Sequence, residues 1–371
     1  MKRAIVSVIN DLSTDQRVDK VCKTLTKAGY DVLLVGRRKK DSRNLEERLY
    51  KTHRMNLLFE KEAIFYAEFN IRLFFFLLFN KTSLLIANDL DTLLPNFLIS
   101  NLKRIPLVYD SHEYFTEVPE LINNNFARNI WLKIENIIFP RLKHVFTVNQ
   151  SIAEIYKTKY NVNVNIVRNI PLRKENQIIK SRKELGLDEN KSIILLQGAG
   201  INIDRGVEEL VEAMQYMENI LLLIIGDGDV INDLKNLTEK LKIQHKVEFI
   251  KRIPYQELIH YTANADLGLS LDKDTNLNYR YSLPNKLFDY INAGIPVLVS
   301  DLPEVKRIVT EYNVGEILFS HKPEDIAEKI RNMLKNKDKI AEYKTNTQKA
   351  SLVLCWENEE KELLKVYDLY A

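Results

Sequence analysis

The residues from Pro284 to Gly294 are of the types that a phosphate-binding helix needs. Proline is favoured at the first helical position, where its missing N–H costs nothing, so we expect the helix to begin at Pro284. Leu287, Phe288 and Ile291 recur at helical spacing and predict a buried stripe. Gly294 provides the residue that commonly ends a helix. The pattern predicts a short amphipathic helix whose first turn is open to a ligand.

The first turn of this predicted helix could bind an anion. The backbone N–H groups of Asn285, Lys286 and Leu287 would have no partner within the helix, and the helix dipole favours a negative charge there. The Lys286 ammonium adds positive charge. Asp289 lies one turn further in, where its carboxylate could accept both hydroxyls of a ribose. These residues predict a nucleotide site, and an ordinary capped core helix is the alternative interpretation.

Two glycine-containing loops follow predicted strands in the same half of the chain. The first contains Gly198 and Gly200 and leads to Arg205, whose guanidinium could bind a diphosphate. The second begins at Gly226 and forms a tight turn that would bring backbone close to a ligand. A dinucleotide fingerprint needs a further glycine where Ile231 stands, so we set dinucleotide binding aside.

The first half of the chain has a histidine at the end of a predicted strand. Ligands of open α/β sheets gather at the carboxyl ends of the strands, and His112 follows such a strand. It could donate to a leaving oxygen or orient a sugar hydroxyl, or it could be a structural hydrogen-bonding residue. Polar loops after two other strands could line an acceptor site. Their candidate residues are Asn10, Asp11, Asp15, Asn88, Asp89 and Asp91.

The Asp89-Leu90-Asp91 sequence has the form that some sugar-nucleotide enzymes use to hold a divalent metal. Those enzymes carry their nucleotide domain at the front of the chain, whereas here the phosphate-binding features lie in the back half. We therefore expect no metal ion and no cofactor.

The elements that must position these residues form an α/β pattern that occurs twice. Buried parallel strands are expected over residues 4–9, 31–35, 84–87, 107–109 and 144–148 in the first half, and over 192–197, 221–225, 247–250, 267–271, 297–300 and 315–319 in the second. Helices are expected over 17–28, 127–138 and 207–214. The hinge between the halves is expected at residues 168–171.

Length and composition agree with two ordinary cores. The chain has 371 residues, of which 45% are apolar, enough for two domains of roughly 150 to 200 residues. Cys22 and Cys355 lie far apart and indicate neither a disulfide scaffold nor a zinc site, which fits a reducing, cytoplasmic setting. The longest uncharged apolar run, Leu73 to Phe79, is far shorter than a spanning helix. We expect a protein that is soluble or peripheral to a membrane.

Positive charge is concentrated in the first half. Residues 1–170 carry 26 Lys and Arg against 18 Asp and Glu, although the whole chain has a net charge of only +3. Much of the excess lies in Arg37, Arg38, Lys39, Lys40, Arg43, Arg48, Lys51 and Arg54. An apolar, aromatic stretch from Phe69 to Phe79 follows. This pattern is typical of a protein surface that binds an anionic membrane, or of a solvated loop followed by a core helix. No motif indicates binding to nucleic acid.

Taken together, these motifs resemble the family 4 glycosyltransferases. The resemblance covers nearly the whole chain and rests on Arg205-Gly206, Ile225 to Gly228, Val247 to Phe249, Asn264 to Asp266, Pro284 to Tyr290 and Ala293 to Val297. It implies the α/β GT-B fold, with two facing Rossmann-like domains and a cleft between them. Residues 1–168 would form the acceptor-side domain, 169–355 the nucleotide-sugar-binding domain, and 356–371 a helix that crosses back onto the first.

The resemblance also implies an activity. The protein would transfer a sugar, with retention and without a metal, from a donor such as a UDP- or GDP-sugar to a glycan or lipid-linked glycan at the inner membrane face. Asp289 would bind the ribose, Arg205 and the amides near Asn285 the diphosphate, and His112 the transferring sugar. The donor set would be Gly198, Gly200, Arg205, Gly226, Asn285, Lys286, Leu287 and Asp289, and the catalytic set His112, Arg205 and Lys286.

The chain departs from the family pattern at the donor site. The family has two glutamates eight residues apart; Asp289 takes the later position and Tyr281 the earlier one. A basic residue common after the first glycine is replaced by Ala199 or Gly200, and Lys286 or Arg280 would have to compensate. The loss of the first glutamate leaves a non-catalytic partner subunit of the same fold as an alternative. A sugar-nucleotide epimerase, which shares the two-domain arrangement but requires no separate acceptor, is a second alternative.

Overall fold

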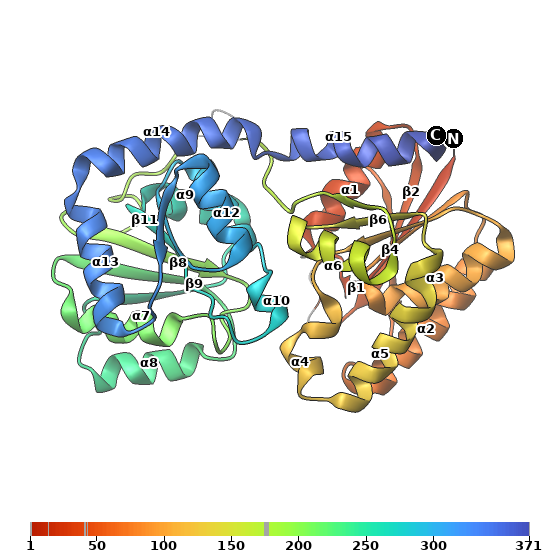
Figure 1. The fold of residues 1–371 in the computed structure, drawn as a ribbon, viewed down its shortest axis with the longest axis horizontal. Coiled ribbons are helices and arrows are strands. Elements are labelled where there is room, and N and C mark those ends of the chain that lie inside the picture. Colours follow the sequence, from red (N-terminus) through yellow and green to blue (C-terminus); the bar gives the residue numbers. More distant parts are fainter. Residues whose placement is uncertain (1, 14, 41, 43, 174–177, 371) are drawn as a thin grey trace. The chain divides into compact units, whose positions relative to one another are not determined.

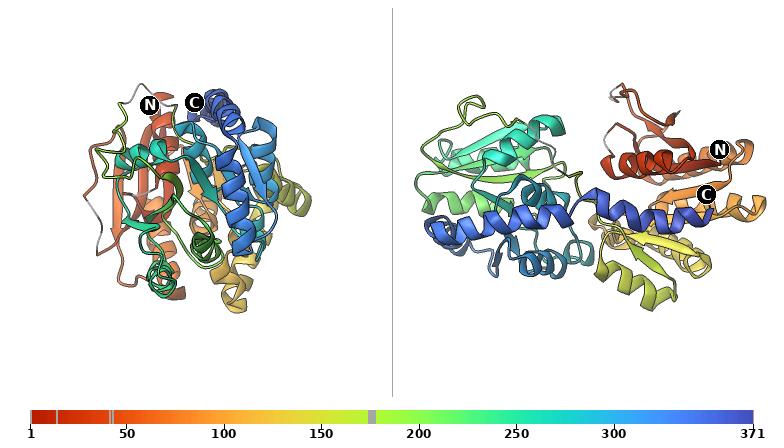
Figure 2. Two further views of the ribbon diagram at one scale, coloured as in Figure 1. Left: turned by 90° about the vertical axis from the view of Figure 1, so that its left-hand side faces the viewer. Right: turned by 90° about the horizontal axis from the view of Figure 1, so that it is seen from above.

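The computed structural model describes residues 2–13, 15–40, 42, 44–173 and 178–370. It divides into two compact units, which we call the N-terminal unit (residues 1–169 and 358–371) and the C-terminal unit (residues 170–357). Each unit is built on a parallel sheet with helices on both faces, as Figure 1 and Figure 2 show from three directions.

The described residues of the N-terminal unit form a seven-stranded parallel sheet of order β3-β2-β1-β4-β5-β6-β7. Its strands are β1 (Arg3–Asp11), β2 (Asp31–Arg38), β3 (Lys51–Asn56), β4 (Leu84–Asn88), β5 (Leu107–Ser111), β6 (His144–Thr147) and β7 (Val164–Ile166). Every residue of β4 and β5 is buried, as expected of central parallel strands. The polar side chains that follow these strands therefore lie at one edge of the sheet.

Helices of the N-terminal unit are α1 (Gln16–Lys27), α2 (Glu62–Phe79), α3 (Leu90–Lys103), α4 (Pro119–Ile122), α5 (Asn125–Ile138) and α6 (Gln150–Tyr160). The side chain of Asp15 caps α1 by accepting from the Val18 N–H at 3.1 Å, and Asn149 caps α6 in the same way from Ile152 at 3.0 Å. These caps fix where α1 and α6 start, directly after β1 and β6.

The five strands predicted for the first half are confirmed, but two others were missed. Strand β3, with the sequence Lys-Thr-His-Arg-Met-Asn, lies at the sheet edge and buries only Met55. A strand with so little buried surface carries no apolar run for a sequence pattern to detect. Strand β7 has three residues, which is too short for a periodic signal.

The described residues of the C-terminal unit form a six-stranded parallel sheet of order β10-β9-β8-β11-β12-β13. The strands are β8 (Ser192–Gly198), β9 (Ile220–Gly226), β10 (Val247–Lys251), β11 (Leu267–Ser270), β12 (Val297–Ser300) and β13 (Gly315–Leu318), and all six match the predicted ranges closely. The helices are α7 (Val207–Ala213), α8 (Ile231–Lys240), α9 (Tyr255–Asn264), α10 (Leu277–Arg280), α11 (Asn285–Ala293), α12 (Pro303–Tyr312), α13 (Pro323–Lys335) and α14 (Lys337–Val353).

Two apolar cores lie on opposite faces of this second sheet. One joins the sheet to α7 and α13 through residues such as Leu210 and Ile330. The other joins it to α11 and α12 through Leu287, Phe288 and Val305. The buried stripe predicted for residues 284–294 is therefore the face of α11 that anchors it to the sheet.

The last helix, α15 (Trp356–Tyr367), returns to the N-terminal unit and packs against its other elements. Thr24 of α1 donates to Glu360 at 2.9 Å, and the Tyr30 hydroxyl donates to the Tyr367 carbonyl at 2.7 Å. Arg168 donates to Glu359 through its backbone N–H at 2.7 Å. The returning C-terminal helix implied by the resemblance is thus present.

Candidate active site

Helix α11 begins one residue later than predicted. Pro284 has φ −70° and ψ 140°, so it is the extended residue before the helix, and its carbonyl accepts from the Leu287 N–H at 3.1 Å. The expectation that Leu287 presents an open amide is therefore wrong. The amides of Asn285 and Lys286 have no acceptor among the described residues and remain available to an anion. Gly294 ends the helix at φ 83°, as predicted.

Asp289 is held in place by two donors that the sequence did not reveal. Its Oδ2 accepts from Gln197 Nε2 at 3.2 Å and its Oδ1 from the Tyr255 hydroxyl at 3.0 Å. Thr262 donates to Gln197 Oε1 at 2.7 Å and so fixes the orientation of that amide. Burial and the Asp289 charge raise the pKa of Tyr255, which keeps its hydroxyl a donor. The sequence feature that could have indicated the contact with Gln197 is the presence of this polar residue in an otherwise apolar strand.

The two glycine loops form one layer at the carboxyl ends of β8 and β9. The Asp227 N–H donates to the Gly198 carbonyl at 3.3 Å, and the Ile201 N–H donates to the Asp227 carbonyl at 2.9 Å. Gly226 has φ +146°, and a Cβ there would lie 1.8 Å from the Gly198 carbonyl oxygen. By contrast, a Cβ on Gly200 would meet only the Asn202 side chain at 3.8 Å. Close packing thus requires glycine at 226 and leaves position 200 open.

Arg205 and Lys286 converge on one buried carboxylate, that of Asp272. Arg205 Nη1 lies 3.3 Å and Lys286 Nζ 3.8 Å from Asp272 Oδ1. The Arg205 guanidinium also stacks over the Tyr279 ring, 4.1 Å from its centroid. Burial lowers the pKa of Lys286, partly offset by Asp272. The structure thereby gathers two predicted phosphate ligands and adds a carboxylate that the sequence motifs did not single out.

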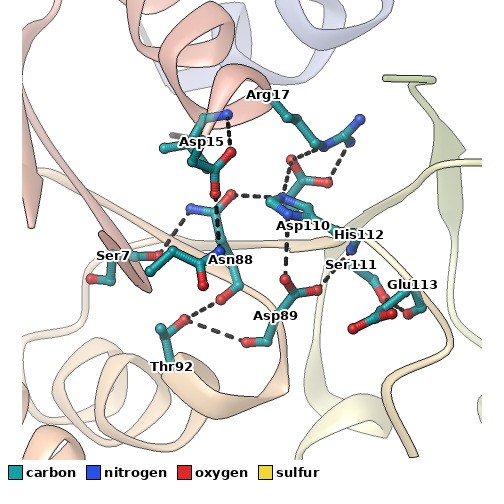
Figure 3. Close-up of polar contacts among 12 residues, drawn as sticks. Ser7, Asp15, Arg17, Asn88, Asp89, Thr92, Asp110, Ser111, His112 and Glu113 are labelled. Carbon is teal, nitrogen blue, oxygen red and sulfur yellow. Dashed lines mark hydrogen bonds and ion pairs between the residues drawn. The ribbon is translucent and has the colours of Figure 1, made fainter. Parts of the chain in front are cut away.

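The histidine site of the N-terminal unit lies just beyond β5. Figure 3 shows the His112 ring between Asn88, Asp89 and Asp110. Asp89 Oδ1 accepts from the His112 backbone N–H at 2.8 Å, and its Oδ2 lies 3.3 Å from Nδ1. On the other side, Nε2 lies 3.1 Å from Asn88 Oδ1 and 3.6 Å from Asp110 Oδ2. Both ring nitrogens thus face oxygen acceptors.

These contacts make His112 a cation at neutral pH. Burial alone would disfavour the charged ring, but Asp89 and Asp110 outweigh it and raise the pKa of His112 to about 9. Despite its burial, Asp110 stays ionised because the Arg17 guanidinium donates to both of its oxygens, at 3.1 and 2.6 Å, and holds its pKa low. A protonated imidazole can donate to a substrate oxygen but cannot act as a base.

The predicted acceptor-side residues separate into different environments. Asn88 and Asp89 contact His112, and Asn10, near the end of β1, donates to Asp15 at 3.2 Å. Asp11 is turned toward Ser42, the Ser13 N–H and Arg54 Nη2, the last at 3.3 Å. Asp91 is buried in the first turn of α3, and its Oδ1 has no hydrogen-bond partner among the described residues.

Several of the basic residues considered for membrane binding make contacts within the N-terminal unit. Arg48 donates to the Leu12 carbonyl at 2.7 Å, Lys51 pairs with Asp31 at 3.0 Å, and Arg37 stacks over Phe65. Arg38, Lys39 and Lys40 are exposed at the end of β2, and Arg43 lies outside the described residues. Among the described helices, none is both long and apolar enough to span a bilayer.

Two family models match the chain, one on each unit. Residues 15–171 match Glycosyltransferase Family 4, and residues 177–350 match Glycosyl transferases group 1. The chain belongs to glycosyltransferase family 4. The predicted resemblance is thereby confirmed.

Curated relatives of this family 4 chain match it over part of their length. An uncharacterized glycosyltransferase of Methanocaldococcus jannaschii is 26% identical over 245 residues, which are 61% of this chain and 60% of the relative. The alpha-monoglucosyldiacylglycerol synthase of Streptococcus pneumoniae is 23% identical over 153 residues, which are 40% of this chain and 33% of that protein. The matched segments thus span less than two thirds of either relative.

Solved structures share the fold over the full length of the chain. Sucrose-phosphate synthase of Thermosynechococcus elongatus has a TM-score of 0.81 at 15% identity and covers 100% of this chain and 99% of its own. The Anabaena protein HepE, in complex with UDP and glucose, has a TM-score of 0.76 at 14% identity and covers 100% of both chains. These likenesses confirm the predicted GT-B fold of this family 4 chain.

Proposed function

We propose that the protein transfers a sugar from a nucleoside-diphosphate donor to a glycan or lipid-linked glycan. The observation that carries this proposal is the convergence of Arg205, Lys286 and the open first turn of α11, with Asp289 one turn along the same helix. Cations and amides suit a diphosphate, and the carboxylate suits the two ribose hydroxyls. HepE, of the same fold, has been solved with UDP and with UDP-glucose, which supports a donor of that class.

In the proposed reaction, the donor site must stabilise the nucleoside diphosphate as it leaves the anomeric carbon. Arg205, Lys286 and the Asn285 and Lys286 amides are fixed donors that can do this without a metal. Removing one preorganised donor of this kind typically costs about 2.7 to 4 kcal/mol of transition-state stabilisation. Gly198 and Gly226 lie at the carboxyl ends of β8 and β9, where the hydrogen bond from Asp227 to Gly198 joins the two loops. Retention of the anomeric configuration is part of the proposal.

We assign His112 to the transferring sugar and its neighbours to the acceptor side. As a cation, His112 can donate to a sugar hydroxyl or to a phosphate oxygen. Asn88, Asp89 and Asp110 surround it with acceptors. Asn10 and Asp15, which hydrogen-bond to each other, are further candidates for the acceptor side, while Asp11 is held by Ser42 and Asp91 is buried, which suits a structural role. The acceptor therefore meets the N-terminal unit in this proposal.

An anionic membrane surface is the proposed location of the acceptor. Helix α2 exposes Ile64, Ile71, Phe75 and Phe79 at spacings of seven, four and four residues, which form one apolar stripe. Exposed Lys61 and Lys81 flank its two ends, in the half of the chain that carries the basic excess. Aromatic and aliphatic side chains beside lysines match the boundary between headgroups and acyl chains. The named lipid product of the Streptococcus relative agrees with such an acceptor.

Nucleotide binding tests the donor site. Thermal denaturation is measured with UDP, GDP, ADP and their common sugar conjugates, for the wild type, Asp289→Ala and the exposed control Asp301→Ala. A ligand at 100 times its dissociation constant adds about 2.7 kcal/mol to the stability of the folded state. We expect one nucleotide to stabilise the wild type and the control but not Asp289→Ala.

The same assay, with product analysis in the absence of an acceptor, separates the alternatives. No stabilisation by any nucleotide would contradict the donor site and favour a non-catalytic partner subunit. The presence of Tyr281, where the family has a glutamate, is compatible with that alternative. Conversion of a bound nucleotide sugar to its epimer without an acceptor would replace the transferase with an epimerase.

A further inference from the structure

Asp272 is a buried carboxylate whose oxygens lack hydrogen-bond donors. It follows β11, and its side chain is 2% exposed. Neither of its carboxylate oxygens accepts a hydrogen bond from a described residue. Its ion-pair partners are Arg205 and Lys286, at 3.3 and 3.8 Å. A buried ion normally requires both pairing and hydrogen bonds, so this contact is a loose one that another anion could replace.

The backbone around Asp272 is fixed by neighbouring loops. The Lys273 N–H donates to the Asp204 carbonyl at 2.9 Å, and His321 Nε2 lies 3.0 Å from the Leu271 carbonyl oxygen. Gly206 packs so closely on Leu271 that a Cβ at position 206 would lie 2.2 Å from that same oxygen. The carboxylate is therefore held beside the Arg205 and Lys286 side chains by a well-ordered backbone.

We propose that Asp272 is an internal counterion that takes the place of the donor diphosphate at Arg205 and Lys286. This inference rests on the proposed donor site. With no nucleotide bound, Asp272 offsets the repulsion between the two cations and keeps them side by side. When the diphosphate arrives, the two cations pair with it, and Asp272 remains as a nearby negative charge. That charge weakens the binding of the nucleoside diphosphate and speeds its release after transfer.

The matched variant is Asp272→Asn, which keeps the shape of the side chain and removes its charge. A unit charge within a few ångströms of a titrating group typically shifts its pKa by a unit or more, which is tenfold in an equilibrium constant. We therefore expect Asp272→Asn to bind nucleoside diphosphate about tenfold more tightly than the wild type, and its melting temperature without ligand to fall. A lower donor KM together with a lower kcat is the expected kinetic signature, because product release slows.

Calorimetric titration with UDP, GDP, ADP and inorganic pyrophosphate measures this directly. Asp272→Glu keeps the charge and should not tighten binding, and Asp338→Asn, which removes an exposed carboxylate of the same unit, should bind as the wild type does. Weaker or unchanged affinity in a folded Asp272→Asn protein, with the wild type binding normally, would overturn the role of Asp272 alone. A wild type that binds none of the four probes would contradict the donor site as well.

Discussion

The carboxylate of Asp89 contacts His112 twice, once at the backbone N–H at 2.8 Å and once at ring Nδ1 at 3.3 Å. Asp89 adopts φ +58°, an uncommon value for a residue with a side chain, as it turns the chain from β4 into α3. The strained turn places the carboxylate directly under the imidazole. Asp89 thus positions His112 and, together with Asp110, favours its charged form.

The raised pKa of His112 predicts a pH-dependent stability. Because the folded-state pKa of about 9 lies above the ordinary histidine pKa of 6.5, the charged ring stabilises the folded state fully below pH 6.5. This contribution is lost as the pH rises through 9. Urea denaturation at pH 6, 7.5 and 9.5 should show a decline in the wild type that His112→Gln lacks. An equal decline in both proteins would contradict the assignment.

The buried pair of Arg17 and Asp110 predicts a large loss of stability when one partner is removed. Arg17→Met leaves the buried Asp110 carboxylate without the two hydrogen bonds of the guanidinium and with only His112 Nε2, at 3.6 Å, as a cationic neighbour, and it also removes the donor to the Val167 carbonyl at 2.7 Å. Breaking such a pair costs about 3 to 5 kcal/mol. The control is Arg3→Met at the partly exposed pair with Asp31, where about 0 to 1 kcal/mol is expected. Chemical denaturation measures both, and similar losses would refute the account.

The two glycine loops predict opposite outcomes for a pair of alanine substitutions. Gly226→Ala forces a Cβ to within 1.8 Å of the Gly198 carbonyl and demands an unfavourable φ. It should lower the melting temperature and abolish nucleotide stabilisation. Gly200→Ala meets only one side-chain atom at 3.8 Å and should melt as the wild type does. Melting curves that rank the two variants the other way would show that the loop packing is misassigned.

The apolar stripe of α2 predicts binding to anionic vesicles. Flotation with phosphatidylglycerol-containing vesicles should recover the wild type, less so at high salt, because lysine attraction is screened. Ile71→Ser/Phe75→Ser should lose binding. Phe126→Ser on α5 changes an even more exposed aromatic residue outside the stripe and should retain binding. An equal loss of vesicle binding in both variants, or a wild type that does not bind the vesicles, would contradict the proposed membrane contact.

Much of the fold could be predicted because its parallel strands are buried on both faces. Runs such as Ile193 to Leu196 are apolar throughout and are bounded by glycine and polar residues, so both position and type follow from the sequence. The edge strand β3 has no such run. Within the donor site, Lys286 and Asp289 share one helix, and helical spacing sufficed to place them together.

The residues that were missed depend on contacts between distant segments. The proposed role of Asp272 depends on its contacts with Arg205 and Lys286, which lie in a different loop and in a helix. Tyr255 reaches Asp289 from α9, and no local pattern predicts that contact. The one-residue error at Pro284 reflects the ability of proline to precede a helix as well as to open it.

Donor turnover tests the central claim most directly. Purified wild type and Arg205→Ala are incubated in EDTA with UDP-, GDP- and ADP-sugars, with and without a lipid extract as acceptor, and free nucleoside diphosphate is measured. We predict that one donor yields acceptor-dependent release by the wild type, and that Arg205→Ala is slower by about 10² to 10³, the usual effect of removing one fixed donor. Release from no donor, or normal release by a folded Arg205→Ala protein, would contradict it.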